Sequence, residues 1–489
     1  MKRHCSLIFP QGLFDRLYAH LFPGDSDEHA AVMLAGLAEM EGKTRLLVRE
    51  LYLAIDGTDH VNGNYGYKMM RAEFIRPLIR RARIERLVYI GVHNHGGEDW
   101  VDFSQDDLDS HDRGHPTLLD LAEGMPVGAV VMAKNAVAGD IWFPDGDRCE
   151  LEETRVLGAN IRRLYATPLP SDRHPAASMV NRQVQMFGED GQALLSGAKI
   201  AVIGAGGVGS LLIEYLARLG IGSLVVIDPD TIDVTNLSRV VGATIVDATG
   251  PSWPIPGFLK KLLFKFPRRK VDIAKRVAKQ ANPRIGFRAI AGDFSRDDVA
   301  RQVLGCDFIF LAADSMRARL VFNAIVQQYF IPGIQIGSLV TPDKNGGSLN
   351  SVFTVTRWVL PGAGCLWCSG TIDRCQLAIE AKSNYEQHDQ DYGSGATNPS
   401  VITLNAVGAS MAINDFLFSY LGLFTPSVIA SPRRVHHLDR RMVEQVLMPN
   451  HDCTECSQSP TSRFGRGTGV ALPTSAYRND GAVTDNGIR

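Results

Sequence analysis

The stretch Lys199-Ile-Ala-Val-Ile-Gly-Ala-Gly-Gly-Val-Gly209 decides the fold of this chain. Its first residues form a short apolar run that is typical of a buried strand, and the run ends in a glycine turn. A helical stretch, SLLIEYLARLG, and a second strand, SLVVID, follow. This order predicts a βαβ unit. Further strand candidates at 308–312 and 334–336 extend it into a Rossmann-like, doubly wound α/β sheet.

The glycine turn is a candidate nucleotide site. Gly204, Gly206, Gly207 and Gly209 lie between the strand and the helix, where backbone N–H groups and the helix N-terminus can bind phosphates. Asp228 stands at the end of the next strand, where a carboxylate can bind ribose hydroxyls. An NAD-dependent dehydrogenase has both features, so these residues leave the nucleotide open.

Three residues further along the chain favour ATP. Asn236, Arg239 and Lys270 bring amide and cationic groups to the same region of the sequence. Displacing pyrophosphate from ATP builds negative charge on the α-phosphate and on the leaving group, and fixed Arg and Lys donors stabilise that charge. Hydride transfer needs no such cationic set, so this pattern disfavours an NAD oxidoreductase.

With these motifs in order, residues 179–440 resemble the ThiF/MoeB/HesA superfamily, the adenylation fold shared with ubiquitin-activating enzymes. The resemblance implies that Arg182, beside Gln183, reaches the nucleotide of a partner subunit in a homodimer. It implies that Lys270 binds ATP and that Asp314 holds Mg²⁺. Its usual substrate is the C-terminal glycine of a ubiquitin-like or sulfur-carrier protein that ends in Gly-Gly.

A second candidate site lies in the first 150 residues. The apolar run LVYIGV ends in His93-Asn-His95, and two histidines at i and i+2 on a strand point to one face, where both can bind one metal ion. Ser104 can cap a helix whose first turn holds Asp107, a third ligand. Two histidines and one carboxylate leave a zinc position for a water molecule, whose pKa the metal lowers. Solvent-facing histidines and an ordinary capping box are the alternative interpretation.

Residues 5–140 resemble the JAB/MPN (JAMM) zinc metallopeptidases, whose motif is an upstream Glu, then His-x-His, then Ser-x-x-Asp. By that resemblance Glu28 transfers the proton and Ser104 stabilises the tetrahedral oxyanion. Glu39 and Glu50 compete with Glu28 for the role of base. The resemblance implies a catalytic Zn²⁺ and an isopeptidase or processing activity.

Two CxxC pairs predict a structural zinc site of four thiolates: Cys365, Cys368, Cys453 and Cys456. Their wide separation means that the metal would tie the end of the adenylation domain to its body; redox-active or unbound thiols are the alternative. Cys375 is a weaker candidate for a thioester-forming nucleophile, because its surroundings read as an ordinary helix.

The motifs divide the chain into an N-terminal JAB-type α/β domain (1–150), a polar, proline-bearing linker (151–177) and an adenylation domain (178–456). Residues 457–489 lack periodicity and apolar clusters, so we expect a disordered tail. Between Asp247 and Arg268, the stretch 249–267 is longer than the resembled family suggests. It is a candidate partner contact or a simple surface excursion, and its basic, amphipathic portion LKKLLFKF is also compatible with docking to a membrane surface or a helix.

Composition limits the partners. Lys plus Arg (51) balance Asp plus Glu (53) over 489 residues, which disfavours nucleic acid and anionic membranes as partners. Pro10 interrupts the N-terminal apolar run and no later run reaches membrane-spanning length, so we expect a cytoplasmic protein.

Together these patterns predict an enzyme that activates the C-terminus of a ubiquitin-like protein with ATP and Mg²⁺. A zinc-dependent domain would process or deconjugate that protein. A conjugating-enzyme-like protein is a further candidate partner. Sulfur-carrier activation in cofactor biosynthesis and a non-catalytic scaffold that binds a ubiquitin-like protein are the alternatives.

Overall fold

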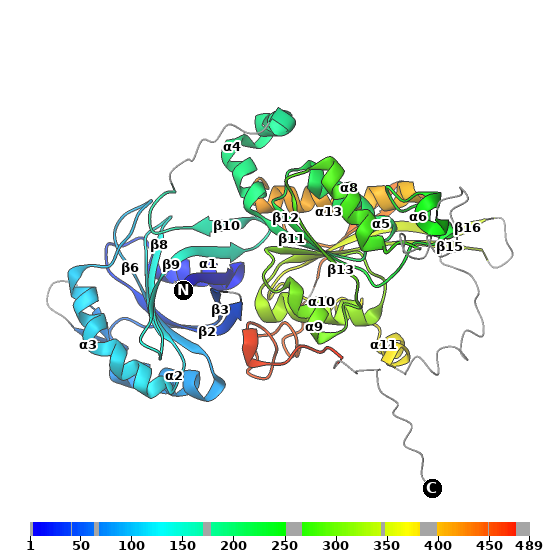
Figure 1. The fold of residues 1–489 in the computed structure, drawn as a ribbon. Coiled ribbons are helices and arrows are strands. Elements are labelled where there is room, and N and C mark those ends of the chain that lie inside the picture. Colours follow the sequence, from blue (N-terminus) through cyan, green and yellow to red (C-terminus); the bar gives the residue numbers. More distant parts are fainter. Residues whose placement is uncertain are drawn as a thin grey trace, which may run out of the picture.

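The chain folds around two β-sheets, each associated with helices (Figure 1). The computed structural model describes residues 3–40, 42–62, 68–169, 178–250, 267–343, 348–381, 399–447 and 449–475. One sheet belongs to the N-terminal domain and the other to residues 178–456, the predicted adenylation domain, which keeps that name below. This confirms the mixed α/β class.

The N-terminal sheet has the strand order β1-β3-β2-β6-β7-β8-β9-β10, and β1 also pairs with β9, so the sheet closes on itself. Its strands are β1 (His4–Pro10), β2 (Ala30–Met40), β3 (Lys43–Leu53), β6 (Val88–Asn94), β7 (Val127–Met132), β8 (Val137–Trp142), β9 (Arg148–Leu157) and β10 (Ile161–Leu164). A separate hairpin pairs β4 (His60–Asn62) with β5 (Lys68–Met70). The helices are α1 (Gln11–Leu21), α2 (Ala72–Glu85) and α3 (Gln105–Ala122).

The adenylation domain has the strand order β13-β12-β11-β14-β15-β16-β17-β18. Its strands are β11 (Lys199–Ile203), β12 (Ser223–Ile227), β13 (Gly286–Ile290), β14 (Phe308–Leu311), β15 (Gly333–Pro342), β16 (Leu349–Val359), β17 (Arg433–His436) and β18 (Arg441–Glu444). Its helices are α4 (Asn181–Gly197), α5 (Gly207–Arg218), α6 (Ile245–Thr249), α8 (Lys270–Ala281), α9 (Asp297–Ala300), α10 (Met316–Tyr329), α11 (Arg374–Ala381) and α13 (Ile402–Tyr420).

The first five strands in this order are parallel, and their arrangement fixes the place of a nucleotide site. Helices α5, α8 and α13 lie on one face of the sheet, with α9 and α10 on the other (Figure 1). Strands β11 and β14 are neighbours, and the chain turns in opposite directions from them. Open α/β sheets bind ligands beyond the carboxyl ends of the strands at such a switch point. The glycine turn follows β11 at this point, which confirms the predicted Rossmann-like architecture.

The two domains are joined by charged groups that are buried or partly buried. Arg155 on β9 donates a hydrogen bond of 2.7 Å to Asp307, just before β14. Arg45 on β3 is 7% exposed, and its guanidinium donates to the carbonyl oxygens of Leu304 and Cys306. Desolvating charged groups is costly, so these bonds are needed to keep the interface closed.

Residues 457–475 form a strap between the domains, drawn in red in Figure 1. Phe464 is 1% exposed, and its ring centroid lies 4.9 Å from that of Phe330. The fully buried Arg49 donates to the carbonyl oxygens of Phe464 and Ser459. The backbone of the strap thus supplies hydrogen-bond acceptors for a buried guanidinium group of the N-terminal domain.

Two predicted boundaries are wrong in part. Residues 151–164 belong to strands β9 and β10 rather than to a linker, because they complete the closed sheet. The predicted tail is ordered over 457–475, where a segment without periodicity is held by hydrogen bonds to both domains. Residues 170–177 and 476–489 of these predictions lie outside the described residues, as does 251–266, most of the longer stretch.

None of the helices in the described part of the chain combines the length and apolar character needed to cross a membrane.

Candidate functional sites

The glycine turn has the close backbone packing that requires glycine. Gly204 has φ +94°, and a Cβ atom there would lie 2.9 Å from the carbonyl carbon of Ala312. A Cβ on Gly209 would lie 1.8 Å from the carbonyl oxygen of Gly204. A Cβ on Gly206, in contrast, would meet nothing within 4 Å. The turn is therefore tight against the protein and open at Gly206, where a phosphate group could approach the backbone.

Asp228 lies against this turn. Its carboxylate accepts hydrogen bonds from the backbone N–H groups of Ala205, at 2.6 Å, and Asp230, at 2.9 Å. Burial raises the pKa of Asp228, although the two backbone donors oppose the shift. The structure thus brings the ends of β11 and β12 together through this side chain.

The cationic residues are placed near the same crevice. Lys270, at the start of α8, forms an ion pair of 2.7 Å with Asp230. The Cδ atom of Arg239 is 3.3 Å from the Cβ position of Gly207, so the arginine stem lies beside the glycine turn. Asn236 accepts a hydrogen bond from the N–H of Asp233 and thereby caps the short helical turn before Arg239.

Asp314 is exposed and lies three residues after β14, immediately before the cap of α10. The neighbouring Ala312 donates its N–H to the carbonyl oxygen of Ile203 on β11, which joins this loop to the base of the glycine turn. The carboxylate of Asp314 therefore stands at the same edge of the sheet as the turn.

Arg182 is not brought to this cluster within the chain. It is exposed near the start of α4, a helix that extends away from the second sheet (Figure 1). Gly188, with φ +76°, interrupts the helical geometry of α4, and Gln183 donates to the carbonyl oxygen of Arg218. A role for Arg182 at a nucleotide would have to be played at another subunit.

In the N-terminal domain, three side chains converge in the geometry of a metal site. The Nε2 atoms of His93 and His95 are 3.1 Å apart, and they lie 3.4 and 3.3 Å from the two carboxylate oxygens of Asp107. Tetrahedral zinc with bonds of ~2.0 to 2.1 Å separates its ligand atoms by about 3.3 Å. The three residues therefore fit a zinc ion with one position left open.

The surrounding contacts orient these ligands. His95 Nδ1 lies 3.1 Å from the carbonyl oxygen of Asp102, and donating its proton there leaves Nε2 free for a metal. Burial would raise the pKa of Asp107, but the contacts with His93 and His95 outweigh it and hold this pKa well below its usual range. Ser104 caps α3, and its hydroxyl donates to Asp107 at 2.6 Å. In this conformation Ser104 holds a ligand, and its proton is not free for an oxyanion.

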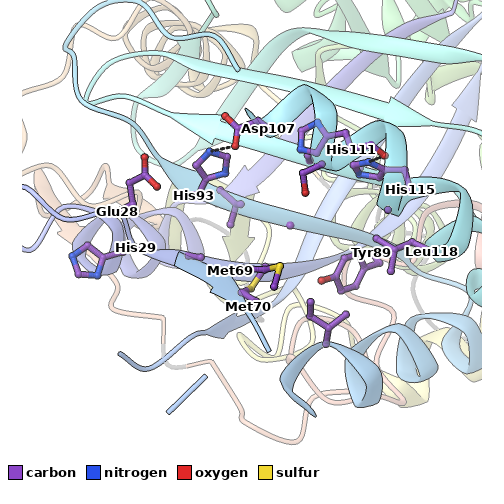
Figure 2. A pocket seen from close by; sticks show the side chains of 18 residues that line it. Glu28, His29, Met69, Met70, Tyr89, His93, Asp107, His111, His115 and Leu118 are labelled. Carbon is purple, nitrogen blue, oxygen red and sulfur yellow. Dashed lines mark hydrogen bonds and ion pairs between the residues drawn. The ribbon is translucent and has the colours of Figure 1, made fainter. Parts of the chain in front are cut away.

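Of the three candidate bases, only Glu28 lies at the metal-ligand cluster. It lines a cavity of about 210 Å³ together with His93 and Asp107 (Figure 2). Glu50 is buried elsewhere and is bound by Arg81. Glu39 lines a different pocket. The rest of the Glu28 cavity is mostly apolar, with Met69, Met70, Ile75, Tyr89 and Leu118 in its wall.

Two further residues at this site were not predicted from the sequence. Asn94, between the two histidines, accepts the N–H of His29 at 2.6 Å and donates to the carbonyl oxygen of Asp27, so it holds the turn that carries Glu28. Side chains alternate between the two faces of a strand, so the pattern that places both histidines on one face places Asn94 on the other. The sequence therefore contained a signal for the position of Asn94. His111 follows Asp107 by one helical turn and lines the cavity, and burial lowers its pKa to about 4.

The four cysteines of the two CxxC pairs meet in space. Sγ–Sγ distances are 3.7 Å for Cys365 to Cys368 and to Cys453, and 3.6 Å for Cys368 to Cys456. Tetrahedral zinc with bonds of ~2.3 Å separates its sulfur ligands by about 3.8 Å, so the cluster fits that ion and is too wide for disulfides. The contact with Cys456 lowers the pKa of Cys365, which favours a thiolate there. Cys375 is exposed on α11 and outside this cluster.

Curated proteins with similar sequences match part of the chain. The SAMP-activating enzyme E1 of Haloferax volcanii is 28% identical over 145 residues, which cover 30% of this chain and 47% of that protein. The tRNA threonylcarbamoyladenosine dehydratase of Escherichia coli is 29% identical over 167 residues, 34% of this chain and 53% of that protein. Adenylyltransferase and sulfurtransferase MOCS3 of Oryza sativa is 36% identical over 117 residues, which cover 19% of this chain and 26% of that protein. The chain spans about half or less of the length of these relatives.

Among solved structures, Escherichia coli MccB with ATP is similar with a TM-score of 0.43 and 20% identity, covering 59% of this chain and 76% of that one. A model of the ThiF family matches residues 180–456. The match lies outside the N-terminal domain, whose metallopeptidase resemblance depends on its own residues and geometry. Since the matched residues make up more than half of the sequence, the chain belongs to the ThiF family.

Proposed function

We propose that residues 178–456 adenylate the C-terminal glycine of a small carrier protein, and that the N-terminal domain is a zinc peptidase acting on the same carrier. The observation that carries the adenylation proposal is the convergence of the glycine turn, Asp228, Arg239 and Lys270 at one edge of the sheet, beside Asp314. Several relatives are named as activating enzymes or adenylyltransferases, which supports the same reaction.

In this reaction a carboxylate oxygen of the carrier attacks the α-phosphorus of ATP. The new bond forms as the bond to the β-phosphate oxygen breaks, giving an acyl-adenylate and pyrophosphate. The N–H groups near Gly206 bind phosphate oxygens, and Lys270 and Arg239 stabilise the charge that develops on the α-phosphate and leaving group. Mg²⁺, when held by Asp314, neutralises charge on the pyrophosphate. Asp228 binds the ribose and fixes the nucleotide's position.

The peptidase proposal is supported by the ligand geometry of His93, His95 and Asp107 and by Glu28 in the adjoining cavity. Zinc, when bound, supplies a water of lowered pKa. Glu28 would take a proton from that water and pass it to the leaving amine. Ser104 would orient Asp107, and it could stabilise an oxyanion only by turning its hydroxyl away from that ligand.

The carrier could be a ubiquitin-like protein or a sulfur carrier, since both end in a slender glycine tail. The names of the relatives include both kinds of chemistry. We favour the ubiquitin-like carrier, because a peptidase that exposes or releases a diglycine terminus complements an enzyme that activates it. We also propose a homodimer, in which Arg182 of one subunit acts at the nucleotide of the other.

The test of adenylation is ATP–pyrophosphate exchange with candidate carriers of both kinds. Asp314→Ala and Arg239→Ala should each lower exchange by ~10²-fold or more, because both handle charge in the transition state. Arg218→Ala is the matched control, since that arginine forms a surface pair with Glu214 on α5. Near-normal exchange by both site variants would exclude the assignment, and absence of exchange with every carrier would favour a binding scaffold.

The test of the peptidase is cleavage of a carrier extended beyond its diglycine, measured together with zinc content. His95→Ala should lose one bound zinc and the cleavage activity while keeping exchange. Cys365→Ser should lose the other zinc and keep the metal of the histidine site. Full cleavage by His95→Ala would disprove the peptidase assignment.

A further inference from the structure

Three arginines gather on one face of the sheet beyond β14. Arg434 on β17 is opposite Val355 on β16, and Arg357 is two residues from Val355, so both arginines share a face. Arg319 approaches from α10, and its positive charge acts on Arg357. In the described ranges, none of the three forms an ion pair with a carboxylate.

These arginines have unused hydrogen-bond donors. Arg357 donates one bond of 2.6 Å to Gln335, and Arg434 lies over the ring of Phe353 at 4.5 Å. The Nε atoms of Arg319 and Arg434 are buried, and they have no hydrogen-bond partner among the residues that the structure describes. A buried N–H group without an acceptor is costly, so a ligand that supplies acceptors would be bound favourably.

The cluster also carries uncompensated charge. Burial and then the charges of Arg319 and Arg434 lower the pKa of Arg357 to about 10. The acidic side chains whose charges act on Arg319 are Asp314 and Glu380, and Glu380 already accepts the N–H groups of Met316 and Arg317 at the start of α10. An incoming anion would relieve the repulsion among the three guanidinium groups.

The strand register places the cluster beside the adenylation site. Leu311 on β14 is in register with Gln335 on β15, and Gln335 is opposite Arg357 on β16. Neighbouring strands are ~4.8 Å apart, so Arg357 lies about 10 Å across the sheet from the strand that leads to Asp314. β16 and β17 lie on the side of β14 away from β11 and β12, where the nucleotide residues are. Arg357 and Arg434 are therefore displaced from the expected phosphates, whereas the charge of Arg319 interacts with that of Asp314.

We propose that Arg319, Arg357 and Arg434 bind an acidic side chain of the carrier's C-terminal tail, three or four residues before the terminal glycine. The proposal rests on the adenylation function, because the tail must end at the α-phosphate near Asp314. An extended chain advances ~3.3 Å per residue, so about 10 Å corresponds to three residues. Carboxylates accept paired hydrogen bonds from guanidinium groups, which suits this set of donors.

The test uses the full-length protein and fluorescein-labelled short peptides that end in Gly-Gly and differ only by Glu or Gln at the fourth position from the end. Fluorescence anisotropy should give about tenfold tighter binding for the Glu peptide. Arg357→Gln and Arg434→Gln should each bring the ratio of the two affinities close to one. Arg441→Gln is the matched control on the neighbouring strand, where the arginine is exposed and pairs with Asp439.

Each outcome of the binding experiment tests a different part of the proposal. Equal binding of both peptides by the native protein, or an unchanged preference in both site variants, overturns the proposal. Loss of affinity for ATP in Arg357→Gln, with the peptide preference intact, would assign the cluster to the nucleotide instead. A glutamate preference without pyrophosphate exchange would overturn adenylation and keep this site. Thermal unfolding checks each variant, and Arg434→Gln alone carries the test if Arg357→Gln does not fold.

Discussion

Arg155 and Asp307 form a 2.7 Å ion pair that joins the closed sheet of the N-terminal domain to the residue just before β14. The second carboxylate oxygen of Asp307 accepts the N–H of Lys199, at the start of β11. The N-terminal domain is thus bound to both central strands of the adenylation sheet, at the end opposite the glycine turn. The two domains are therefore in contact at this interface as well as being joined by the chain.

Stability should depend on this pair and on pH. Burial would raise the pKa of Asp307, but Arg155 and Arg45 outweigh it and lower that pKa. Its stabilising contribution is therefore complete above the carboxylate's unfolded pKa of ~3.9 and is lost as the pH falls through the lower folded value. Arg155→Met leaves a buried charge less compensated and should cost about 3 kcal/mol near pH 7. The loss of stability on acidification should then be smaller than in the native protein, because the folded pKa of Asp307 lies closer to its unfolded value without Arg155.

Thermal unfolding between pH 3 and 7 measures both effects. A native-like melting temperature in Arg155→Met at every pH would show that Arg45 alone compensates Asp307.

The strap should be displaced by a single methyl group. A Cβ atom on Gly36 would lie 1.8 Å from the carbonyl oxygen of Gly465, and neither backbone can move without separating β2 from the strap. Gly36→Ala should destabilise the protein by about 1 to 3 kcal/mol and should make residues near 465 sensitive to protease. Gly12→Ala is the matched control, because a Cβ there meets nothing within 4 Å. Equal proteolysis of the two variants would argue against a packed strap.

Glu28 should be needed for cleavage but not for zinc binding. Glu28→Gln keeps the shape of the side chain and removes its basicity, so cleavage should fall by ~10² to 10⁴-fold. Glu39→Gln is the control, since Glu39 lines a separate pocket. The cleavage rate and the zinc content of both variants measure this effect. Equal cleavage rates in the two variants would mean that a group other than Glu28 is the base.

Arg182 and Lys270 should complement each other between subunits. If Arg182 acts on a partner's nucleotide, Arg182→Ala and Lys270→Ala proteins are each inactive in exchange, but a mixed dimer contains one site with both residues intact. An equal mixture should recover up to about a quarter of native exchange if subunits mix at random and only complete sites act. A mixture no more active than its components would mean that the site is built within one chain.

Local sequence patterns predicted the parts of the sites that are formed by residues close to one another in the sequence. The glycine turn, the alternating histidines of β6 and the Ser104 cap each follow from spacing along a strand or at a helix start. The choice of Glu28 over Glu50 could not follow from spacing, because it depends on Arg81 occupying Glu50 from another element.

The domain interface could not be predicted for a related reason. Arg45 and Arg49 read as surface charges on a strand, and their acceptors are backbone carbonyl groups more than 250 residues later. Carbonyl groups have no sequence signature. The polar composition of 457–475 likewise predicts disorder, although this segment supplies the acceptors for Arg49 and the apolar Phe464.

The position of the strap also sets an order of events during synthesis. Residues 457–475 follow both domains in the chain, so the space between β2 and α10 is unfilled when the ribosome has finished the two sheets. Until the last turn of this segment arrives, Arg49 has no backbone acceptor from it, and the apolar surface around Phe330 is accessible to chaperones. A nascent chain stalled before residue 457 would therefore hold two folded sheets whose docking is incomplete.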